Sequence, residues 1–509
     1  MPPKKVLIVG AGASGMSCAH HMSTHPNLFA PTVLESTKQV GGQAFSIPLP
    51  PDLGASWLNQ GVQGGSNAFR HTLSLMSTLK HPATPVRLQV SFGKHATFWT
   101  NMFKTQLVAR HAREIGRFVR ALSWLGWAEP LVALVPAWAL MRLLGFSTDF
   151  VELLVLPSVA LFLGTGNETP SVPAIAMRRL YTSPNFGMWN PPHEERLAAN
   201  MPPMVVFPEL SLFYGHWAKV LEERGVAIRL ETTLLKVHER GPAGVVVTIR
   251  GPGGNVTTER YDELVLCVLA DTALVLLGDQ ATWVERAVLG GAKWSDDITV
   301  THTDAEYMRR HYTTEFDAAQ AVEGETVQGT DGFCPMYYVR PSPVAHEKIE
   351  LSFDCTHYQP QFAAPGLPPA RHVPPEKHVF QSIFLNKDRD SALWTKDEIR
   401  RDKVIREDWW HQLCHSWTHY VRVVPWVWAL NWRGLGGDGG TRTTYAGSWT
   451  VVNAHEVAIL SGLSAAWRLG ASYPEELRGD KVAWNSFWMY TLLCHGKWAE
   501  GGPWIRGGV

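Results

Sequence analysis

A glycine-rich turn at the N-terminus constrains the fold of this chain more than any other feature. The apolar run KVLIV, residues 5–9, is typical of a buried strand, and it leads into Gly10-Ala-Gly12-Ala-Ser-Gly15 and then MSCAHHM, which is typical of a helix. In this strand-turn-helix setting, G-x-G-x-x-G is the fingerprint of a dinucleotide-binding Rossmann unit. The first glycine permits the tight turn, the second lets a pyrophosphate approach the backbone, and the third allows close packing of helix on strand. We therefore predict a phosphate site at Gly10, Gly12, Ala13, Ser14 and Gly15, facing the start of the helix.

An acidic residue follows at the spacing that a Rossmann unit requires. A second predicted strand, TVLE, ends at Glu35, twenty residues after Gly15. A carboxylate in this position binds the ribose hydroxyls of a dinucleotide. Glu35 is therefore the predicted ribose ligand.

The residues after Glu35 narrow the choice of dinucleotide. Gly41 and Gly42 follow within STKQVGGQAFS, and DLGASWL follows at 52–58. This order resembles the extended fingerprint of the FAD-dependent amine oxidase and phytoene desaturase superfamily. The resemblance implies FAD as cofactor, with a glycine pair that lets the ribityl chain and isoalloxazine lie against bare backbone. It adds these residues to the cofactor site: Gly41, Gly42, Gln43, Gly54, Ala55, Ser56 and Trp57. Gln43 stands where the family commonly has Arg or Lys, so one charge near the pyrophosphate is missing.

The same resemblance gives a role to the C-terminal segment AGSWTVVNAHEVAILSG, residues 446–462. In the superfamily a last strand and helix close the flavin site, which assigns Gly447, Ser448, Ala454, His455 and Glu456 to the cofactor. We expect Asn453 to cap the helix and Glu456 to complete a capping box. The helix start would then face the electron-rich edge of the flavin. The alternative is that His455 and Glu456 form an acid–base dyad. A metal site is not predicted, because there is no HExxH pattern.

Two departures separate the chain from the amine oxidases. Ala454 occupies the position of a tyrosine that forms half of their aromatic cage, and the flavin-side lysine of many of them is not evident in DITVTHTDAEYM, residues 297–308. Instead, HTD at 302–304 and PSVALFLGT at 157–165 resemble FAD-binding oxidoreductases related to the flavin-dependent fatty-acid isomerases. That resemblance implies a lipophilic, unsaturated or fatty-acid-like substrate and hydride transfer to flavin N5, with oxidation, desaturation or double-bond isomerisation as the result. The alternatives are an amine oxidase that produces hydrogen peroxide and a non-catalytic flavin- or lipid-binding accessory protein.

Candidate catalytic and anchoring residues follow from the chemistry of such a substrate. His302 and His455 are candidate general bases. Arg178, Arg179 and Arg340 are candidate anchors, because a guanidinium binds a carboxylate through two hydrogen bonds. For each of the five, the alternative is an ordinary structural or surface residue.

The length of 509 residues predicts more than one domain. We predict an α/β fold in which a discontinuous Rossmann-type FAD-binding domain is joined to a mixed α+β substrate domain. The FAD-binding domain is assigned to 1–67, 206–294 and 431–475, the substrate domain to 68–205 and 295–430, and a C-terminal extension to 476–509. By resemblance to the second FAD-binding segment of the superfamily, the backbone near Leu234 would bind adenine.

Composition excludes some partners and leaves others open. Lys+Arg and Asp+Glu number 46 each, and this balance argues against nucleic acid. Six cysteines without a CxxC pair suit a reducing compartment, and the N-terminus leads directly into the glycine motif with no signal peptide, so we expect a cytoplasmic protein. The oligomeric state is left open.

The most apolar region, residues 124–166, bears on membrane contact. Charged residues and prolines divide it into pieces shorter than a membrane span. We expect buried helices here. The alternative is a surface that enters a membrane without crossing it, which would make the protein peripheral to that membrane.

Overall fold

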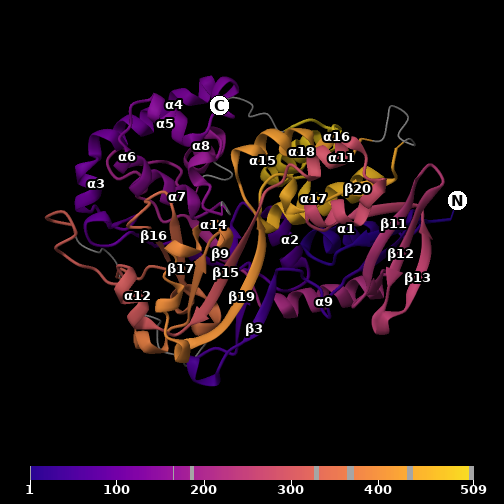
Figure 1. Ribbon diagram of the computed structural model, residues 1–509, viewed down its shortest axis with the longest axis horizontal. Coiled ribbons are helices and arrows are strands. Elements are labelled where there is room, and N and C mark those ends of the chain that lie inside the picture. The colour runs from indigo at the N-terminus through magenta and orange to yellow at the C-terminus, as the bar shows by residue number, and fades with distance from the viewer. Residues whose placement is uncertain are drawn as a thin grey trace.

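The computed structural model describes residues 2–163, 166–183, 188–325, 332–363, 372–432 and 440–503. The chain forms two halves that lie side by side (Figure 1). One half is built on a parallel sheet with the strand order β10-β2-β1-β14-β20. These strands are Ala227–Arg229, Phe29–Leu34, Lys4–Val9, Glu263–Leu266 and Thr443–Tyr445. The predicted α/β class with a Rossmann-type sheet is confirmed.

The register of this sheet brings distant segments to one edge. Val9 is aligned with Leu34 on one side and with Leu266 on the other, and Leu266 is aligned with Tyr445. Because the strands are parallel, their carboxyl ends meet at the same edge, where ligands bind in open α/β sheets. The residues that follow these ends are Gly10, Glu35, Cys267 and Ala446.

Two helices from opposite ends of the chain cross tightly beside this edge. They are α1 (Ala13–Ser23) and α17 (His455–Leu469). A Cβ added at Gly462 would lie 2.0 Å from the carbonyl oxygen of Ser14, so the crossing needs a glycine. The hydroxyl of Ser17 donates to the carbonyl of Ile459 at 2.7 Å. The C-terminal helix is thereby fixed to the first helix of the fold.

Smaller elements complete this half. An antiparallel sheet of β11 (Thr233–Gly241), β12 (Gly244–Arg250) and β13 (Val256–Tyr261) stands at the right in Figure 1, near α9 (Leu210–Glu223). Helix α18 (Lys481–His495) packs on α16 (Val427–Leu430) and α17. The five parallel strands thus come from the three segments assigned to the FAD-binding domain, while the domain boundaries themselves stay a prediction.

The other half contains a seven-stranded mixed sheet and a group of helices. The strand order is β19-β15-β18-β17-β16-β7-β8, with only the β16–β7 pair parallel. These strands are Val404–Leu413, Trp294–His302, Phe380–Phe384, Ile349–Asp354, Tyr337–Pro341, Val90–Phe92 and Trp99–Thr100. This half is mixed α+β, as predicted.

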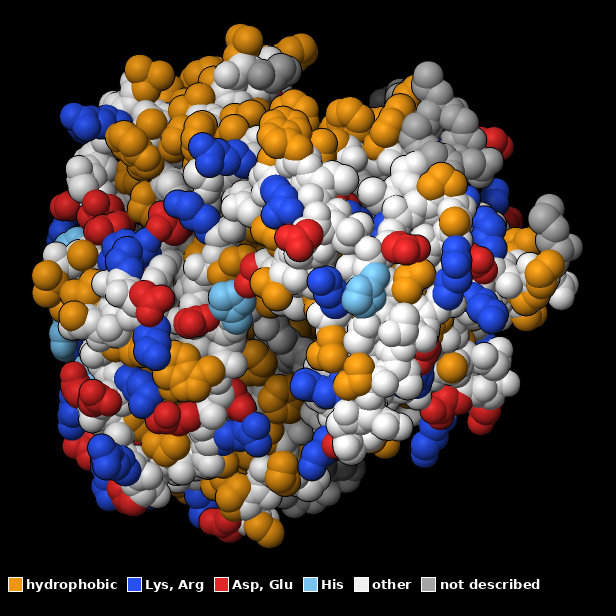
Figure 2. All heavy atoms as spheres, turned by 45° about the vertical axis from the view of Figure 1, so that its right-hand side comes forward, with side chains coloured by type: hydrophobic (Ala, Val, Ile, Leu, Met, Phe, Trp, Pro, Cys, Tyr) orange, Lys and Arg blue, Asp and Glu red, His pale blue; other side chains and the backbone are white. Residues whose placement is uncertain are grey.

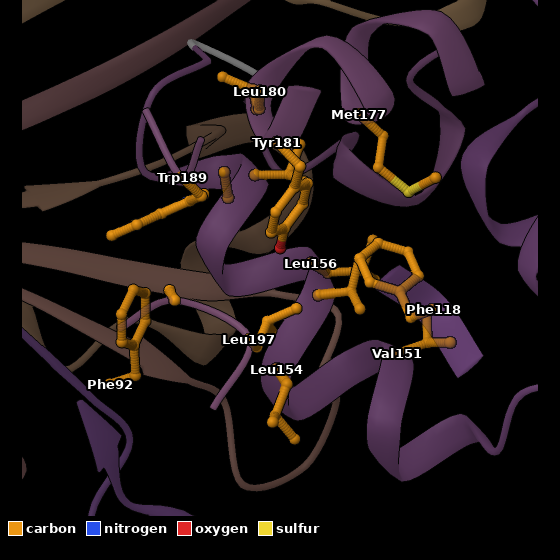
Figure 3. Close-up of a cluster of buried hydrophobic side chains, with 14 of the residues drawn as sticks. Phe92, Phe118, Val151, Leu154, Leu156, Met177, Leu180, Tyr181, Trp189 and Leu197 are labelled. Carbon is orange, nitrogen blue, oxygen red and sulfur yellow. The ribbon is translucent and has the colours of Figure 1, made fainter. Parts of the chain in front are cut away.

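The helices of this half include α4 (Ala112–Val132), α5 (Ala137–Leu143), α7 (Leu156–Ala160) and α8 (Ala174–Thr182). Figure 3 shows the core between them, in which the rings of Phe118 and Tyr181 meet edge to face with centroids 5.3 Å apart. The phenol of Tyr181 is hydrogen-bonded to Ser158. A buried phenol thus keeps a polar partner inside an apolar cluster.

The expectation that residues 124–166 are buried is wrong for one face of α4 and α5. Trp127, Leu131 and Leu143 are 92%, 86% and 81% exposed. Their helices are amphipathic, so the inner face packs on the core and the outer face does not. Figure 2 shows hydrophobic side chains along the upper edge of the molecule. In the described residues, no helix is both long and apolar enough to cross a membrane.

Candidate functional site

The glycine turn has the geometry that its sequence predicts. Gly10 has φ +99°, and an added Cβ would lie 2.8 Å from the carbonyl oxygen of Cys267. An added Cβ at Gly15 would lie 1.8 Å from the carbonyl oxygen of Gly10. Neither position admits a side chain.

Gly12 differs from the other two glycines. It has an ordinary extended φ of −74°, and the nearest neighbour to an added Cβ is the Cα of Gly42, at 3.9 Å. Helix α1 begins at the next residue, and no side chain in the described residues caps it. The uncapped amides of Ala13 and Ser14 and the open side of Gly12 suit an anion at the helix start.

Glu35 is buried where β2 ends. One carboxylate oxygen, Oε2, accepts from the backbone N–H of Ala11 at 2.9 Å, and the other, Oε1, accepts from the N–H and hydroxyl of Thr37 at 2.9 and 3.0 Å. The carbonyl of Glu35 accepts from the N–H of Thr232 at 2.8 Å, two residues before Leu234. The structure therefore brings Leu234, at the start of β11, near the acid. Its role toward adenine stays a prediction.

The glycine pair packs directly on the glycine turn. Gly41 forms a parallel bridge with Gly12, and its N–H donates to the carbonyl of Ala11 at 2.8 Å. Gly42 has φ +61°, and an added Cβ would lie 3.2 Å from the Cα of Gly12. Gln43 reaches the other half of the molecule, where its Nε2 donates to the carbonyl of His411 at 3.2 Å.

Four of the predicted cofactor residues lie apart from this turn. Gly54, Ala55, Ser56 and Trp57 occupy the end of a hairpin formed by β3 (Phe45–Pro48) and β4 (Trp57–Gln60), and Gly54 and Ser56 are exposed. The two strands of the hairpin separate these four residues from Gly42. Their contact with a cofactor stays a prediction.

The predicted capping box at the start of α17 is wrong. The helix begins at His455 with Ala454 as N-cap, and the side chain of Asn453 accepts from the Ser448 hydroxyl at 3.0 Å instead. Glu456 caps a different helix, α2 (Arg70–Thr78). An isolated buried carboxylate is costly, and α2 supplies amides and an imidazole that the short local loop does not.

Both carboxylate oxygens of Glu456 accept hydrogen bonds from the start of α2. Oε1 accepts from the N–H of His71 at 3.0 Å and from its Nδ1 at 2.7 Å, and Oε2 accepts from the N–H of Thr72 at 2.8 Å. The second ring nitrogen of His71 lies 3.1 Å from the hydroxyl of Tyr473. Burial alone would raise the pKa of the Glu456 carboxyl, but His71 and the two amides outweigh it and hold that pKa below its ordinary value.

His455 is hydrogen-bonded to other groups than Glu456 is. Its Nε2 lies 2.7 Å from the hydroxyl of Tyr214, and its Nδ1 lies 3.1 Å from the hydroxyl of Thr72. Burial lowers the pKa of His455 to about 4, so the imidazole is neutral at pH 7. His455 and Glu456 therefore have different partner groups, and the two networks meet at Thr72, whose hydroxyl contacts His455 and whose N–H donates to Glu456. A catalytic role of His455 stays a prediction.

A short chain of hydrogen bonds joins the last strand to the first helix. The N–H of Gly447 donates to the hydroxyl of Ser461 at 2.9 Å, and that hydroxyl lies 3.1 Å from the hydroxyl of Ser14. Gly447 has φ +149°, and an added Cβ would lie 2.6 Å from the ring of Trp449. These contacts fix Gly447 and Ser448 beside the glycine turn.

The remaining predicted residues lie within the other half. His302 is fully buried in β15, where its Nδ1 accepts from the N–H of Asp304 at 3.2 Å and its Nε2 contacts the Ser382 hydroxyl at 3.0 Å. Burial lowers the pKa of His302 to about 3. The structure does not bring His302 to the glycine turn, and its catalytic role stays a prediction.

The three candidate anchors hold carboxylates of the protein itself. Arg178 and Arg179, on α8, both pair with Glu129, and Arg340 pairs with the buried Glu350. Their role toward a substrate stays a prediction.

Neutral polar groups join residues 60–63 to β15 and to the end of α13 (Cys355–Tyr358), and sequence reasoning did not find them. Gln60 Nε2 donates to the Thr301 hydroxyl at 3.0 Å, and Gln63 Oε1 accepts from the hydroxyl of Tyr358 and, at 3.2 Å, from Gln359 Nε2. Their partners are about 240 to 300 positions apart in the chain, and no local pattern marks such pairs. The same holds for Glu456 with His71, and for Tyr214 with His455.

Comparisons with known proteins agree with this geometry. The NAD(P)-binding Rossmann-like domain family matches residues 8–74. Lysine-specific histone demethylase 1 homolog 3 of Arabidopsis thaliana is 44% identical over 57 residues, which are 10% of this chain and only 3% of that protein.

Solved structures match over most of the chain. Putrescine oxidase bound to putrescine (12% identity, TM-score 0.58) and cyclohexylamine oxidase from Brevibacterium oxydans IH-35A (12%, TM-score 0.57) each match over 92% of this chain and 99% of theirs. A CLA-producing fatty acid isomerase from P. acnes (15%, TM-score 0.57) matches over 90% of this chain and 97% of its own. The chain thus has the fold of the flavin-type oxidoreductases, and the predicted resemblance is confirmed at the level of fold.

Proposed function

We propose that the chain is an FAD-dependent oxidoreductase. The observation that carries the proposal is the carboxyl edge of the parallel sheet, where the bare backbone of Gly12, the uncapped start of α1 and the buried Glu35 lie together. These features fit the pyrophosphate and ribose of a dinucleotide. FAD bound there would accept a hydride from a carbon of the substrate.

Different residues at this edge would bind different parts of the cofactor. The amides of Ala13 and Ser14 would donate to the pyrophosphate. Glu35 would accept from a ribose hydroxyl, because a carboxylate has about four acceptor positions and, in the described residues, Oε2 accepts one hydrogen bond, from the N–H of Ala11. The start of α17 is uncapped by side chains of the described residues and would direct its amides toward the flavin edge.

The substrate that we propose is lipophilic and unsaturated or fatty-acid-like. Two observations support this class. The hydrogen bonds that residues 59–63 make with β15, β18 and Gln359 come from amides and hydroxyls, and no charged side chain takes part in these contacts. Ala454, half-buried against apolar neighbours, replaces the cage tyrosine that the resemblance to amine oxidases would require. The P. acnes isomerase, which shares the fold, acts on a fatty acid according to its name.

An amine substrate is the second candidate, because putrescine oxidase and cyclohexylamine oxidase share the fold. The discriminating experiment is an anaerobic titration of the purified, FAD-loaded protein, first with a polyunsaturated fatty acid and then with a panel of primary amines. Loss of the flavin absorbance near ~450 nm reports hydride transfer.

The outcomes separate the candidates. Loss of absorbance with the fatty acid supports net oxidation, and a moved double bond without loss of absorbance supports isomerisation. A response to the amines alone contradicts the lipid substrate. No change in absorbance and no product with either class supports the non-catalytic accessory protein.

A further inference from the structure

The exposed face of α4 carries arginines toward the start of the helix and large apolar side chains toward its end. Arg113, Arg117 and Arg120 are followed by Trp124, Trp127 and Leu131, and all six are exposed. They are spaced by three or four residues, so they form one stripe along the helix. The stripe is basic in its first half and strongly apolar in its second half.

Helix α5 and the loop before it extend the apolar half of this stripe. Leu134 and Trp138 are 45% and 46% exposed, and Leu143 is exposed as well. The indole N–H of Trp417, on α15 (Trp417–Arg422), donates to the carbonyl of Leu134 at 2.6 Å. Trp417 is itself exposed, so this contact places a further tryptophan beside the apolar half of the stripe.

On the second half, the surface continues over the helices at the upper edge. On α16, α18 and the segments next to them, Trp426, Trp432, Leu493 and Trp498 are exposed. Figure 2 shows hydrophobic side chains gathered along this edge, which Figure 1 identifies as the side that carries α4, α5, α16 and α18. We call this surface, from Trp124 to Trp498, the tryptophan face. Monomeric soluble proteins rarely expose an apolar surface of this extent without a partner.

The charges around the tryptophan face are mostly positive. Residues 110–143 contain five arginines and two glutamates, 417–432 contain one arginine and no acidic residue, and 481–498 contain two lysines and no acidic residue. One of the two glutamates, Glu129, is already paired with Arg178 and Arg179. An anionic surface complements this pattern.

We infer that the tryptophan face docks the protein on an anionic lipid bilayer, with the tryptophans and leucines at the boundary between headgroups and acyl chains. Tryptophan prefers this boundary because its ring is apolar and its N–H is polar. Basic residues beside an apolar helix face are typical of helices that lie in the interface plane. Arg113, Arg117 and Arg120 would then lie at the level of the lipid phosphates.

A second copy of the chain fits this surface less well. A two-fold interface brings the same patch of both copies together, so two surfaces with an excess of positive charge would face each other. Lipid phosphates neutralise that charge.

Vesicle flotation of the full-length protein tests the inference, with vesicles of phosphatidylcholine alone and vesicles that also contain phosphatidylglycerol. The wild type is expected to float with the anionic vesicles. The double variant Trp127→Ser/Leu131→Ser is expected to bind at least about tenfold more weakly, because each buried anchor contributes a large apolar area. The matched control is Leu28→Ser/Leu212→Ser, which replaces two exposed leucines outside the face and is expected to bind like the wild type.

The arginine half of the stripe is tested separately. Arg113→Gln/Arg120→Gln is expected to weaken binding to anionic vesicles by about fivefold per residue and to reduce its dependence on salt. Wild-type protein that stays with the solution would overturn the inference. So would a dimer, seen by sedimentation velocity, that Trp127→Ser/Leu131→Ser dissociates while the wild type binds no vesicles.

Discussion

Replacing Glu456 by glutamine separates a structural role of the His455–Glu456 pair from a catalytic one. The substitution keeps the size of the side chain and removes the charge that both His71 and the start of α2 face. It also puts an amide N–H opposite groups that donate. Removing the charge of a buried carboxylate that accepts three hydrogen bonds is expected to cost about 3–5 kcal/mol, because its donors lose their acceptor.

This cost can be converted into a shift of the unfolding midpoint. The entropy of unfolding is about 2.1 cal/mol/K per residue, so a chain of 509 residues has about 1 kcal/mol/K. The midpoint of thermal unfolding of Glu456→Gln is therefore expected to fall by about 3–5 °C. Because the same two side chains are involved, the shift in Glu456→Gln/His71→Gln is expected to be smaller than the sum of the single shifts.

The assay is thermal denaturation of the FAD-loaded protein followed by circular dichroism, together with the rate of flavin reduction by substrate below the midpoint. Glu222→Gln, on the exposed side of α9, is the matched control and is expected to change neither quantity. An unchanged midpoint together with a rate that falls a hundredfold or more would refute the structural role, because it would mean that Glu456 acts on the substrate.

Two further predictions concern the buried charged and titratable groups. Burial lowers the pKa of His455 to about 4 and that of His302 to about 3, from an ordinary value of 6.5. Between each lowered pKa and 6.5, the unfolded chain therefore binds more protons than the folded chain does. The free energy of unfolding falls as the pH falls from 6.5 toward 4, by about 3 kcal/mol for His455 alone. Unfolding midpoints measured from pH 7 to pH 4 should fall steadily, and a flat profile would contradict neutral buried histidines. Arg340→Gln should lower the midpoint by about 3–5 °C, because it leaves the buried carboxylate of Glu350 without its guanidinium. A raised KM for a fatty acid at an unchanged midpoint would instead make Arg340 a substrate anchor.

The parts of the fold that follow from the sequence are those encoded by neighbouring residues. The strand, the three glycines and Glu35 lie within 35 positions, and each is required by backbone geometry that can be deduced from the residue type. The parallel sheet and the mixed second half could therefore be predicted in outline.

The parts that could not be predicted depend on contacts between distant residues. Glu456 caps a helix 385 positions earlier, although its local pattern predicts a cap on its own helix. The exposure of Trp127 is also set by which face of α4 meets the core, and a run of apolar residues alone does not identify that face. Capping and burial are decided by tertiary packing in both cases.

Binding of FAD at the carboxyl edge of the parallel sheet can be measured by calorimetric titration of the apoprotein with FAD. Wild type and Gly12→Val are compared, because Gly12 has an ordinary φ and an added Cβ would have no atom closer than 3.9 Å, so the variant is expected to fold. Gly479→Val, at a position with no atom within 4 Å of an added Cβ, is the control. We expect the wild type and the control to bind FAD tightly, and Gly12→Val to bind it at least about a hundredfold more weakly. Equal binding by all three proteins, or no binding by the wild type, would contradict it.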